Sequence, residues 1–292
     1  MKKQYAFQAL TCSVNMFLIA SVLMILFGLA WEYSTRMYLS GFANAVLPAT
    51  SSPENKMLAI LSWMQQGPSR STGYYSDDGE DRDPVDTLNY RELLTVCGTA
   101  TNAFVNLASA SGIEARRLLL LDAHTQTTNH VVAEVFLDGN WIVVDPSYRV
   151  ILKDSSGRFL TKQQLARPEI LRDATQRIPN YNPAYTYDHT AFIHVAGLPL
   201  FGGFLQRNLA AILPVWQDNI NWTVLVERQS YDTIVVGFAL LLCGLVIRSL
   251  ISWYGRRISM TPISPWAQLR RTGVALFSPF DSSATDNTFY GM

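Results

Sequence analysis

The chain has 292 residues, 49% of them hydrophobic, and its 23 basic residues balance its 23 acidic residues. This length suits one or two domains, and the lack of a basic excess argues against a nucleic-acid partner. Along the chain the charge is uneven. Residues 1–31 carry two lysines and no acid, residues 32–232 carry a net charge of −5 (16 basic, 21 acidic), and residues 233–292 one of +3 (5 basic, 2 acidic). Both boundaries fall at hydrophobic segments, which predicts a membrane protein with an acidic central region.

Two segments are long and apolar enough to cross a bilayer as helices. Residues 9–31 carry no formal charge, and about 20 apolar residues suffice to span the hydrocarbon core. Residues 233–254 are uncharged as far as Ile247 and reach full length if Arg248 extends to the membrane surface. Aromatic residues stand at the segment ends, as in an interfacial belt: Trp31, Tyr33, Trp253 and Tyr254.

Basic residues set the predicted orientation. Two lysines precede the first segment, and five arginines lie at and after the end of the second: Arg248, Arg256, Arg257, Arg270 and Arg271. Because basic flanks stay in the cytoplasm, we expect an inner-membrane protein with cytoplasmic residues 1–8, a cytoplasmic basic tail at residues 255–292, and an extracytoplasmic, periplasmic region between the spans. A cleaved signal peptide is the alternative, but no small-residue cleavage site directly follows the long apolar run.

The central region opens with a helix start. Ser52 is a capping residue, Pro53 takes the first helical position, and Glu54 lies in the first turn. An apolar face follows, and Gly67-Pro68 ends the helix. Residues 69–92 are polar and acidic; their spacing does not match a calcium-binding EF-hand, so we predict a solvated loop.

Cys97 stands just before a second predicted helix, residues 98–111, which Gly112 ends. Three strands are predicted after it, at residues 113–121, 131–137 and 141–144. The last two are joined by Asp138-Gly139, a strong hairpin signal.

The hairpin turn determines which side chains share a face of the sheet. A two-residue loop pairs Leu137 with Asn140, so Asp145 lies opposite Val132 and His130 becomes its diagonal neighbour on the same face. The opposite face is then uniformly apolar and must be core: Val131, Ala133, Val135, Leu137, Ile142 and Val144. A three-residue loop would send His130 and Asp145 to opposite faces. The selected face also carries Glu134 and Trp141.

Cys97, His130 and Asp145 are the residue types that thiol acyl-transfer chemistry requires. A thiol becomes nucleophilic as a thiolate, which a helix N-terminus and an imidazolium both favour. The imidazole needs a third group to fix its orientation. Cys97 is the only thiol between the two spans, since Cys12 and Cys243 lie within them. The alternative interpretation is a buried small apolar residue, which is common for free cysteine.

The rest of the central region is less informative. Residues 151–190 contain turns and many polar groups and are expected to be surface elaboration. Residues 191–232 form a membrane-proximal apolar segment, of which residues 191–216 either lie on the membrane or pack against the second span. His189 and His194 give only a weak metal signal, so neither a metal nor a cofactor is expected.

Residues 95–149 resemble the transglutaminase-like superfamily of Cys-His-Asp proteins. The matching pieces are Val96-Cys97-Gly98, then Ser111-Gly112-Ile113-Glu114-Ala115-Arg116, then residues 130–141 with His130 and Trp141, and finally Val144-Asp145-Pro146. The resemblance implies a papain-like α+β domain, placed at residues 45–190, in a membrane-anchored bacterial-type member.

The resemblance also implies roles for these residues. Cys97 would be the nucleophile, His130 the base and later the acid, and Asp145 the orienting carboxylate. Two departures stand out: Val131-Val132 replaces the Ala-Trp of many members, and no upstream oxyanion donor is evident. The Cys97 N–H is one natural donor, and Tyr74, Tyr75 or Tyr90 are candidates for another.

Two hypotheses follow. The first is a thiol enzyme (protease, amidase or transglutaminase) acting on an extracytoplasmic protein, a cell-wall peptide or a polymer-linked amide, in a groove lined by Trp141. The second is a non-catalytic binding or scaffold module in a membrane assembly that handles exported polymers. Membrane lipid and other membrane proteins are the expected neighbours in either case.

Overall fold

The computed structural model describes residues 2–47, 52–66, 83–90, 92–193, 222–223 and 228–258. Most of the predicted acidic loop, the apolar residues 194–221 and the tail after residue 258 lie outside the described residues. The chain divides into two compact units, one formed by residues 1–27 and 234–292 and the other by residues 28–233.

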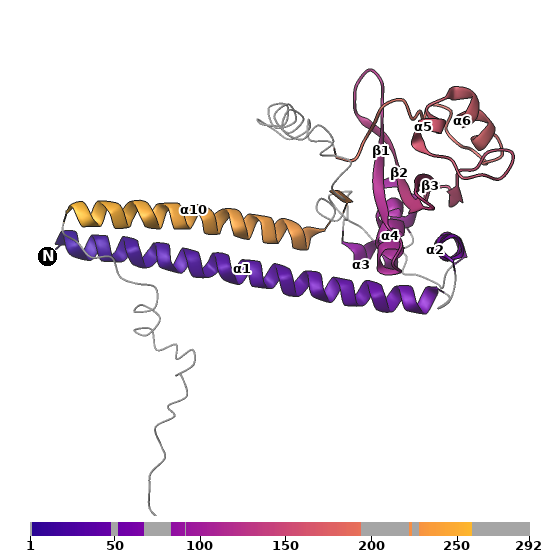
Figure 1. The fold of residues 1–292 in the computed structure, drawn as a ribbon. Coiled ribbons are helices and arrows are strands. Elements are labelled where there is room, and N and C mark those ends of the chain that lie inside the picture. Colours follow the sequence, from indigo (N-terminus) through magenta and orange to yellow (C-terminus); the bar gives the residue numbers. More distant parts are fainter. Residues whose placement is uncertain are drawn as a thin grey trace, which may run out of the picture. The chain divides into compact units, whose positions relative to one another are not determined.

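Two long helices supply the first unit. They are α1 (Lys2–Val46) and α10 (Gln229–Arg257) (Figure 1). Both are long and apolar enough to cross a membrane by length and composition. Each contains one of the predicted spans, although α1 continues 15 residues beyond the predicted boundary at residue 31.

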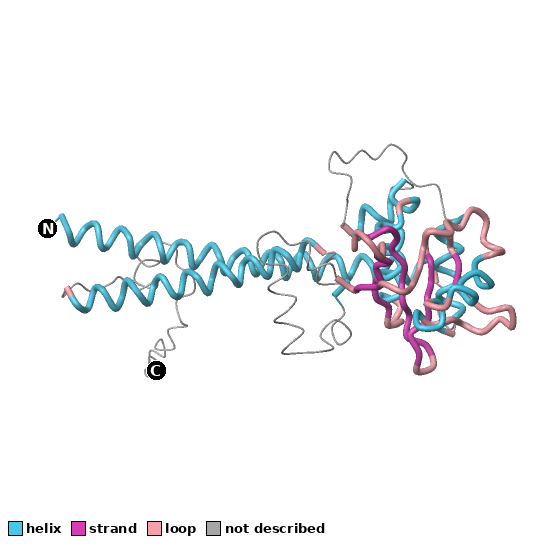
Figure 2. The backbone as a smooth tube through the Cα atoms, turned by 90° about the horizontal axis from the view of Figure 1, so that it is seen from above, coloured by secondary structure: helices cyan, strands magenta, loops and turns pink. Residues whose placement is uncertain are grey.

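Within this unit α1 and α10 run side by side, as Figures 1 and 2 both show. Two glycines of α10 allow the close approach. A Cβ at Gly237 would lie 2.8 Å from Ile25 Cγ1, and one at Gly244 would lie 2.7 Å from Leu18 Cδ2. Large apolar side chains such as Leu23, Phe27 and Leu242 are exposed on the outside of the pair.

The second unit is an α+β fold, as the sequence predicted. Its five-stranded antiparallel sheet has the order β4-β3-β2-β1-β5. The strands are β1 (Ala115–Leu121), β2 (Thr128–Leu137), β3 (Asn140–Asp145), β4 (Val150–Ile151) and β5 (Thr190–Ala191). The helices are α2 (Pro53–Gln66), α3 (Pro84–Asn89), a 3-10 turn (Glu92–Thr95), α4 (Cys97–Ala110), α5 (Lys162–Leu165) and α6 (Pro168–Thr175).

The predicted hairpin register is confirmed. Leu137 pairs with Asn140, and the ladder continues to Ala133 opposite Val144. The turn residues Asp138 and Gly139 both have positive φ, of 49° and 81°, as a two-residue hairpin turn of this hand requires. The register holds because one apolar face packs against α4, where Ala133 and Val144 share a core cluster with Phe104.

Two predictions about the loops are wrong. Residues 83–90 of the predicted solvated loop are ordered around a helix: Asp83 accepts a hydrogen bond from the Val85 N–H and caps α3, with Pro84 in its first turn. Residues 151–190 are not surface elaboration, because they cover the second face of the sheet. There Leu165, Tyr187 and the neighbouring Phe192 pack on β1–β3 residues such as Val132. Both faces of the sheet are therefore buried.

Candidate active site

Cys97 is the first residue of α4. The capping residue, Val96, is extended and offers no side-chain hydrogen bond to the first turn, so the positive end of the helix dipole acts on the thiol directly. The sulfur is half-buried. A hydrogen bond with His130 lowers the pKa of the thiol; burial opposes this, and the imidazole charge and the backbone of Val131 and Gly98 add to it.

His130 is buried in β2 and links the other two residues. Its Nε2 lies 2.8 Å from Asp145 Oδ2. Its Nδ1 is buried and makes no hydrogen bond of standard geometry to the described residues, Cys97 included; it is the ring nitrogen left to interact with the Cys97 thiol, and the two groups shift each other's pKa. Burial disfavours the imidazolium, but the hydrogen bonds with Asp145 and Cys97 outweigh it and raise the pKa of His130 to about 9.

Asp145 closes β3 and is fully buried. One carboxylate oxygen, Oδ2, pairs with His130; the other, Oδ1, accepts the backbone N–H groups of Ser147 at 3.1 Å and Tyr148 at 3.4 Å. Buried charge is tolerated when it is paired and hydrogen-bonded in this way. The carboxylate is thereby held in one orientation and fixes Nε2 as the proton-bearing nitrogen of a neutral imidazole.

The thiol and the imidazole meet near the start of β2. The helix α4 packs on the apolar face of the sheet, whereas alternation assigns His130 and Asp145 to the other face. The Thr101 hydroxyl donates to the Val131 carbonyl at 3.0 Å, which ties α4 to the residue after His130. The Cys97 side chain packs against Leu119, Leu121 and Val131. A register shift between Leu120 and Leu121 lies at this end of the sheet, and such shifts re-aim side chains.

Tyrosines surround the imidazole on its remaining sides, and the sequence analysis missed them. The Tyr185 ring stacks on His130 with centroids 4.0 Å apart and planes 4° from parallel. Tyr148 meets the same imidazole edge-on at 6.1 Å. Tyr181 contacts both tyrosines, at 4.7 Å and 5.7 Å. The sequence offered one signal for them: three tyrosines occur within residues 181–187, in a segment that the sequence analysis predicted to lie on the surface.

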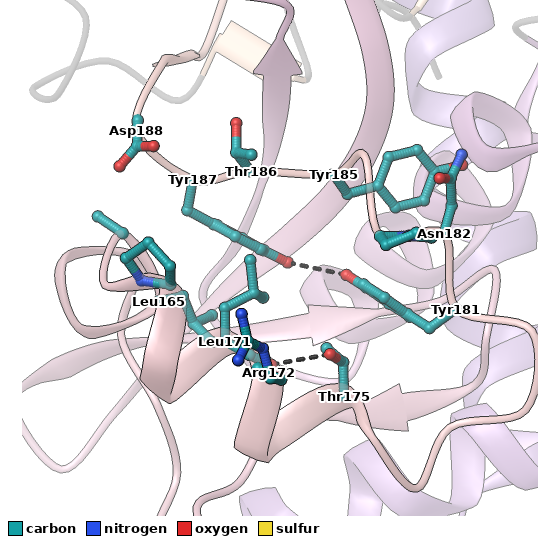
Figure 3. Close-up of a pocket in the computed structure, with 13 residues that line it drawn as sticks. Leu165, Leu171, Arg172, Thr175, Tyr181, Asn182, Tyr185, Thr186, Tyr187 and Asp188 are labelled. Carbon is teal, nitrogen blue, oxygen red and sulfur yellow. Dashed lines mark hydrogen bonds between the residues drawn. The ribbon is translucent and has the colours of Figure 1, made fainter.

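A cavity of about 240 Å³ adjoins this aromatic group. It is lined by α5, α6 and residues 181–188 (Figure 3), and Tyr185 forms part of its wall. The hydroxyls of Tyr181 and Tyr187 point toward one another within it at 3.5 Å. Burial, followed by the negative charge of Asp145, raises the pKa of Tyr181, which keeps this wall neutral.

The other residues predicted on the site face serve a different cluster. Glu134 is fully buried and pairs with Arg116, whose Nη2 lies 2.8 Å from Glu134 Oε2. The Arg116 guanidinium lies between the rings of Trp141 and Phe192, at 3.9 Å and 4.0 Å. Trp141 therefore packs against a buried ion pair, and it is not among the residues that line the cavity beside the triad.

The remaining residues named in the sequence analysis are the tyrosines considered as oxyanion donors and the two histidines considered as metal ligands. Tyr90 ends α3 as its C-cap, whereas Tyr74 and Tyr75 lie outside the described residues. The His189 carbonyl accepts the Leu121 N–H at 2.9 Å, and His194 is likewise outside. Within the described part of the chain no group of three or more His, Cys, Asp or Glu side chains is placed to hold a metal ion.

Comparison with known proteins gives one result. A family model described as Transglutaminase-like superfamily matches residues 40–146. This range begins in α1, ends directly after Asp145 and contains Cys97 and His130. No curated protein gives a significant match to the chain.

Proposed function

We propose that this protein is a membrane-anchored thiol enzyme that cleaves or transfers an acyl group at an amide bond, because the transglutaminase-like superfamily model matches residues 40–146 and members of that superfamily are often thiol enzymes. Cys97 is its nucleophile, His130 its base and acid, and Asp145 its orienting carboxylate. The observations that carry this proposal are the buried hydrogen bond between His130 and Asp145 and the place of Cys97 at the start of α4, where the nearby imidazole lowers the pKa of its thiol.

The chemistry follows from these positions. The Cys97 thiolate attacks the amide carbonyl and forms a carbon–sulfur bond, and the charge that develops on oxygen is stabilised by the N–H groups at the start of α4. The His130 imidazolium gives its proton to the leaving nitrogen, so the carbon–nitrogen bond breaks and an amine departs. Water or a second amine then attacks the thioester, His130 takes its proton, and the thiolate leaves.

The shifted pKa values of the thiol and the imidazole support this cycle. A thiol pKa that is lowered and an imidazole pKa that is raised to about 9 favour the thiolate–imidazolium pair at neutral pH. The nucleophile is then ready before substrate arrives, and the proton that the leaving amine needs is already on His130.

The test is to alkylate the thiols of the full chain in detergent micelles with a stoichiometric amount of iodoacetamide at pH 7. Cys97 should react first, and Cys97→Ala should remove both the rapid phase and any turnover of a peptide amide substrate. Cys12→Ser and Cys243→Ser are the matched controls, because each removes a thiol from one of the long helices and leaves the triad intact. A slow, inert Cys97 would sink the enzyme proposal and favour the scaffold function. Turnover that survives Cys97→Ala would exclude this mechanism.

We also propose that α1 and α10 anchor the protein in the inner membrane with both termini in the cytoplasm and the catalytic region outside. The support is the composition of the two helices and the distribution of arginine. Protease added to the outside of spheroplasts should degrade the region between the spans and spare an epitope tag on the C-terminus. A catalytic region that is digested only after lysis would reverse the orientation.

The substrate class follows from that location. Extracytoplasmic proteins, cell-wall peptides and polymer-linked amides all present amide bonds to this side of the membrane. Hydrolysis and transfer are separated by adding a primary amine during turnover: an acyltransferase forms an amine adduct, whereas a hydrolase releases only the acid.

A further inference from the structure

The Tyr185 ring lies against the His130 imidazole more closely and more nearly parallel than the rings of Tyr148 and Tyr181 lie against their neighbours at this site: 4.0 Å between centroids and 4° between planes. It reaches this position from a loop far along the chain. The loop is fixed locally, because the Tyr185 N–H donates to the Asn182 carbonyl at 3.2 Å and the Ala184 N–H donates to Asn182 Oδ1 at 3.0 Å. The contact is therefore held by a structured turn.

Further contacts brace the same turn. Tyr181 packs edge-on against Tyr185 at 5.7 Å and 88°, and the Tyr148 hydroxyl donates to the Asn180 carbonyl at 3.2 Å. Tyr148 lies in the turn after β3, and its own N–H donates to Asp145 Oδ1 at 3.4 Å. The loop that carries Tyr185 is thus connected to the strand end that carries the carboxylate.

The triad needs such a support because its hydrogen bonds do not define the plane of the imidazole. The bond from Nε2 to Asp145 fixes the position of one ring nitrogen. The ring can still tilt about that point and move Nδ1 away from the Cys97 sulfur, because Nδ1 makes no hydrogen bond of standard geometry that would hold it there. A second ring lying flat against the first removes this freedom, because tilting would drive the two rings into contact.

We propose that Tyr185 is a positioning residue for His130, whose aromatic face holds the imidazole in the line between Cys97 and Asp145 and favours its protonated form. The proposal deepens the proposed function and rests on it. The ring is the active part: an aromatic face attracts a cation placed over it. The groups that meet His130 are Cys97 from α4, Asp145 from β3, Tyr148 from the following turn and Tyr185 from the loop.

The experiment compares Tyr185→Phe, which keeps the ring, with Tyr185→Leu, which keeps bulk but removes the aromatic face. Tyr185 is only half-buried, so both variants should fold. Phe136→Leu is the matched control, because Phe136 of β2 packs against Trp141 of β3, with ring centroids 5.3 Å apart, and does not meet His130. The readouts are the pH dependence of Cys97 alkylation and the separate values of kcat and KM for a peptide amide.

We expect Tyr185→Leu to move the alkylation profile upward by about half a pH unit, the shift that loss of an exposed cation–π contact would produce. It should lower kcat by about tenfold through misplacement of the base and leave KM unchanged. Tyr185→Phe and Phe136→Leu should match the parent. A Tyr185→Leu profile identical to the parent would overturn the proposal, and so would a Tyr185→Phe defect as large as that of Tyr185→Leu, which would assign the effect to the hydroxyl.

A measurement without turnover keeps the two proposals separable. The chain has four histidines, so the ring signals of His130 can be assigned by NMR after selective labelling. Stacking predicts an upfield shift of these signals in the parent and in Tyr185→Phe, lost in Tyr185→Leu. If the signals show no such shift in the parent, the positioning role fails even if Cys97 proves catalytic. If Cys97 proves inert but the shift is present, the proposed function fails and the contact remains.

Discussion

Two of the buried polar clusters in the unit formed by residues 28–233 differ in what they leave accessible. The first is the proposed triad, in which His130 is 2% and Asp145 0% exposed. The second joins Glu32 of α1, Arg228 before α10 and Asn106 of α4, which are 6%, 6% and 4% exposed. Burial and pairing are thus alike in the two clusters, so neither property identifies a reactive site.

The second cluster is closed. Arg228 donates to Glu32 and, from Nη2, to Asn106 Oδ1 at 2.8 Å. Glu32 also accepts Arg36 Nε at 2.6 Å and the Ser230 hydroxyl at 2.8 Å. The triad, in contrast, ends at a half-buried sulfur and a ring nitrogen with no other partner of nitrogen or oxygen among the described residues. The candidate site differs from the closed cluster in two ways: one of its ring nitrogens has no hydrogen-bond partner among the described residues, and its sulfur is accessible to solvent.

The largest effect should come from breaking the triad without changing its shape. In Asp145→Asn the N–H groups of Ser147 and Tyr148 still require an acceptor, so the amide oxygen takes that side and its NH₂ faces His130 Nε2. The imidazole must then carry its proton on Nδ1 and cannot accept one from Cys97. We expect turnover to fall about 10³- to 10⁴-fold with little change in thermal stability.

Asp188→Asn is the matched control for this substitution, since Asp188 is an exposed acid on the cavity wall. It should retain full turnover. A loss of less than tenfold in Asp145→Asn would mean that the carboxylate does not orient the base, and the triad would reduce to a Cys–His pair.

Substitutions in the closed cluster should lower the thermal stability of the protein and leave its turnover nearly unchanged. Arg228→Met leaves the Glu32 carboxylate buried with only Arg36 and Ser230 as donors. Removal of one partner of a buried ion pair costs 3–5 kcal/mol, and the remaining donors place the expected loss at the lower end, about 3 kcal/mol. The thermal denaturation midpoint in micelles should fall, while turnover per folded molecule stays within about twofold of the parent.

Two companion variants sharpen the second comparison. Glu32→Leu combined with Arg228→Met removes both charges and should recover much of the lost stability. Arg158→Met removes an arginine from an exposed pair with Asp154 and should leave the midpoint unchanged. An Arg228→Met protein that is stable but inactive would show that this cluster participates in the chemistry.

The sequence predicted the hairpin and the contact between His130 and Asp145 because both rest on local patterns. The register followed from a two-residue turn and one apolar face, and these fixed Asp145 beside His130 without knowledge of the rest of the fold. The start of α4 at Cys97 was equally local. The resemblance to the superfamily added the roles, and the family match covers the same residues.

The missed features all depend on contacts between distant parts of the chain. Tyr185 reaches His130 from a segment with no regular period, so no pattern indicated which side of the sheet it covers. Arg116 pairs directly across from Glu134, but the connection between β1 and β2 is too long to set their register from sequence. Arg228 has a partner nearly two hundred positions away. Only the α3 cap at Asp83-Pro84 carried a local signal that the sequence analysis overlooked.

The smallest expected effect is on the pH dependence of turnover, which should change when the proposed triad is altered and not when the closed cluster is altered. The pKa of His130 is raised to about 9, so the imidazolium persists at neutral pH and is lost only as pH rises through that value; an ordinary imidazole would lose its proton near 6.5. Turnover limited by proton donation should therefore fall about twofold at pH 9 and about tenfold at pH 10. The lowered pKa of Cys97 extends the active range of the parent protein to lower pH, because the thiolate forms below the pH that an ordinary thiol requires.

Asp145→Asn should move the basic limb of its residual pH–activity profile down toward neutral pH, since the hydrogen bond that favours the imidazolium is gone. Arg228→Met should leave the basic limb of the pH–activity profile unchanged, because neither Arg228 nor any of its partners contacts His130. A basic limb near 6.5 in the parent protein would mean that the ion pair between thiol and imidazole does not form.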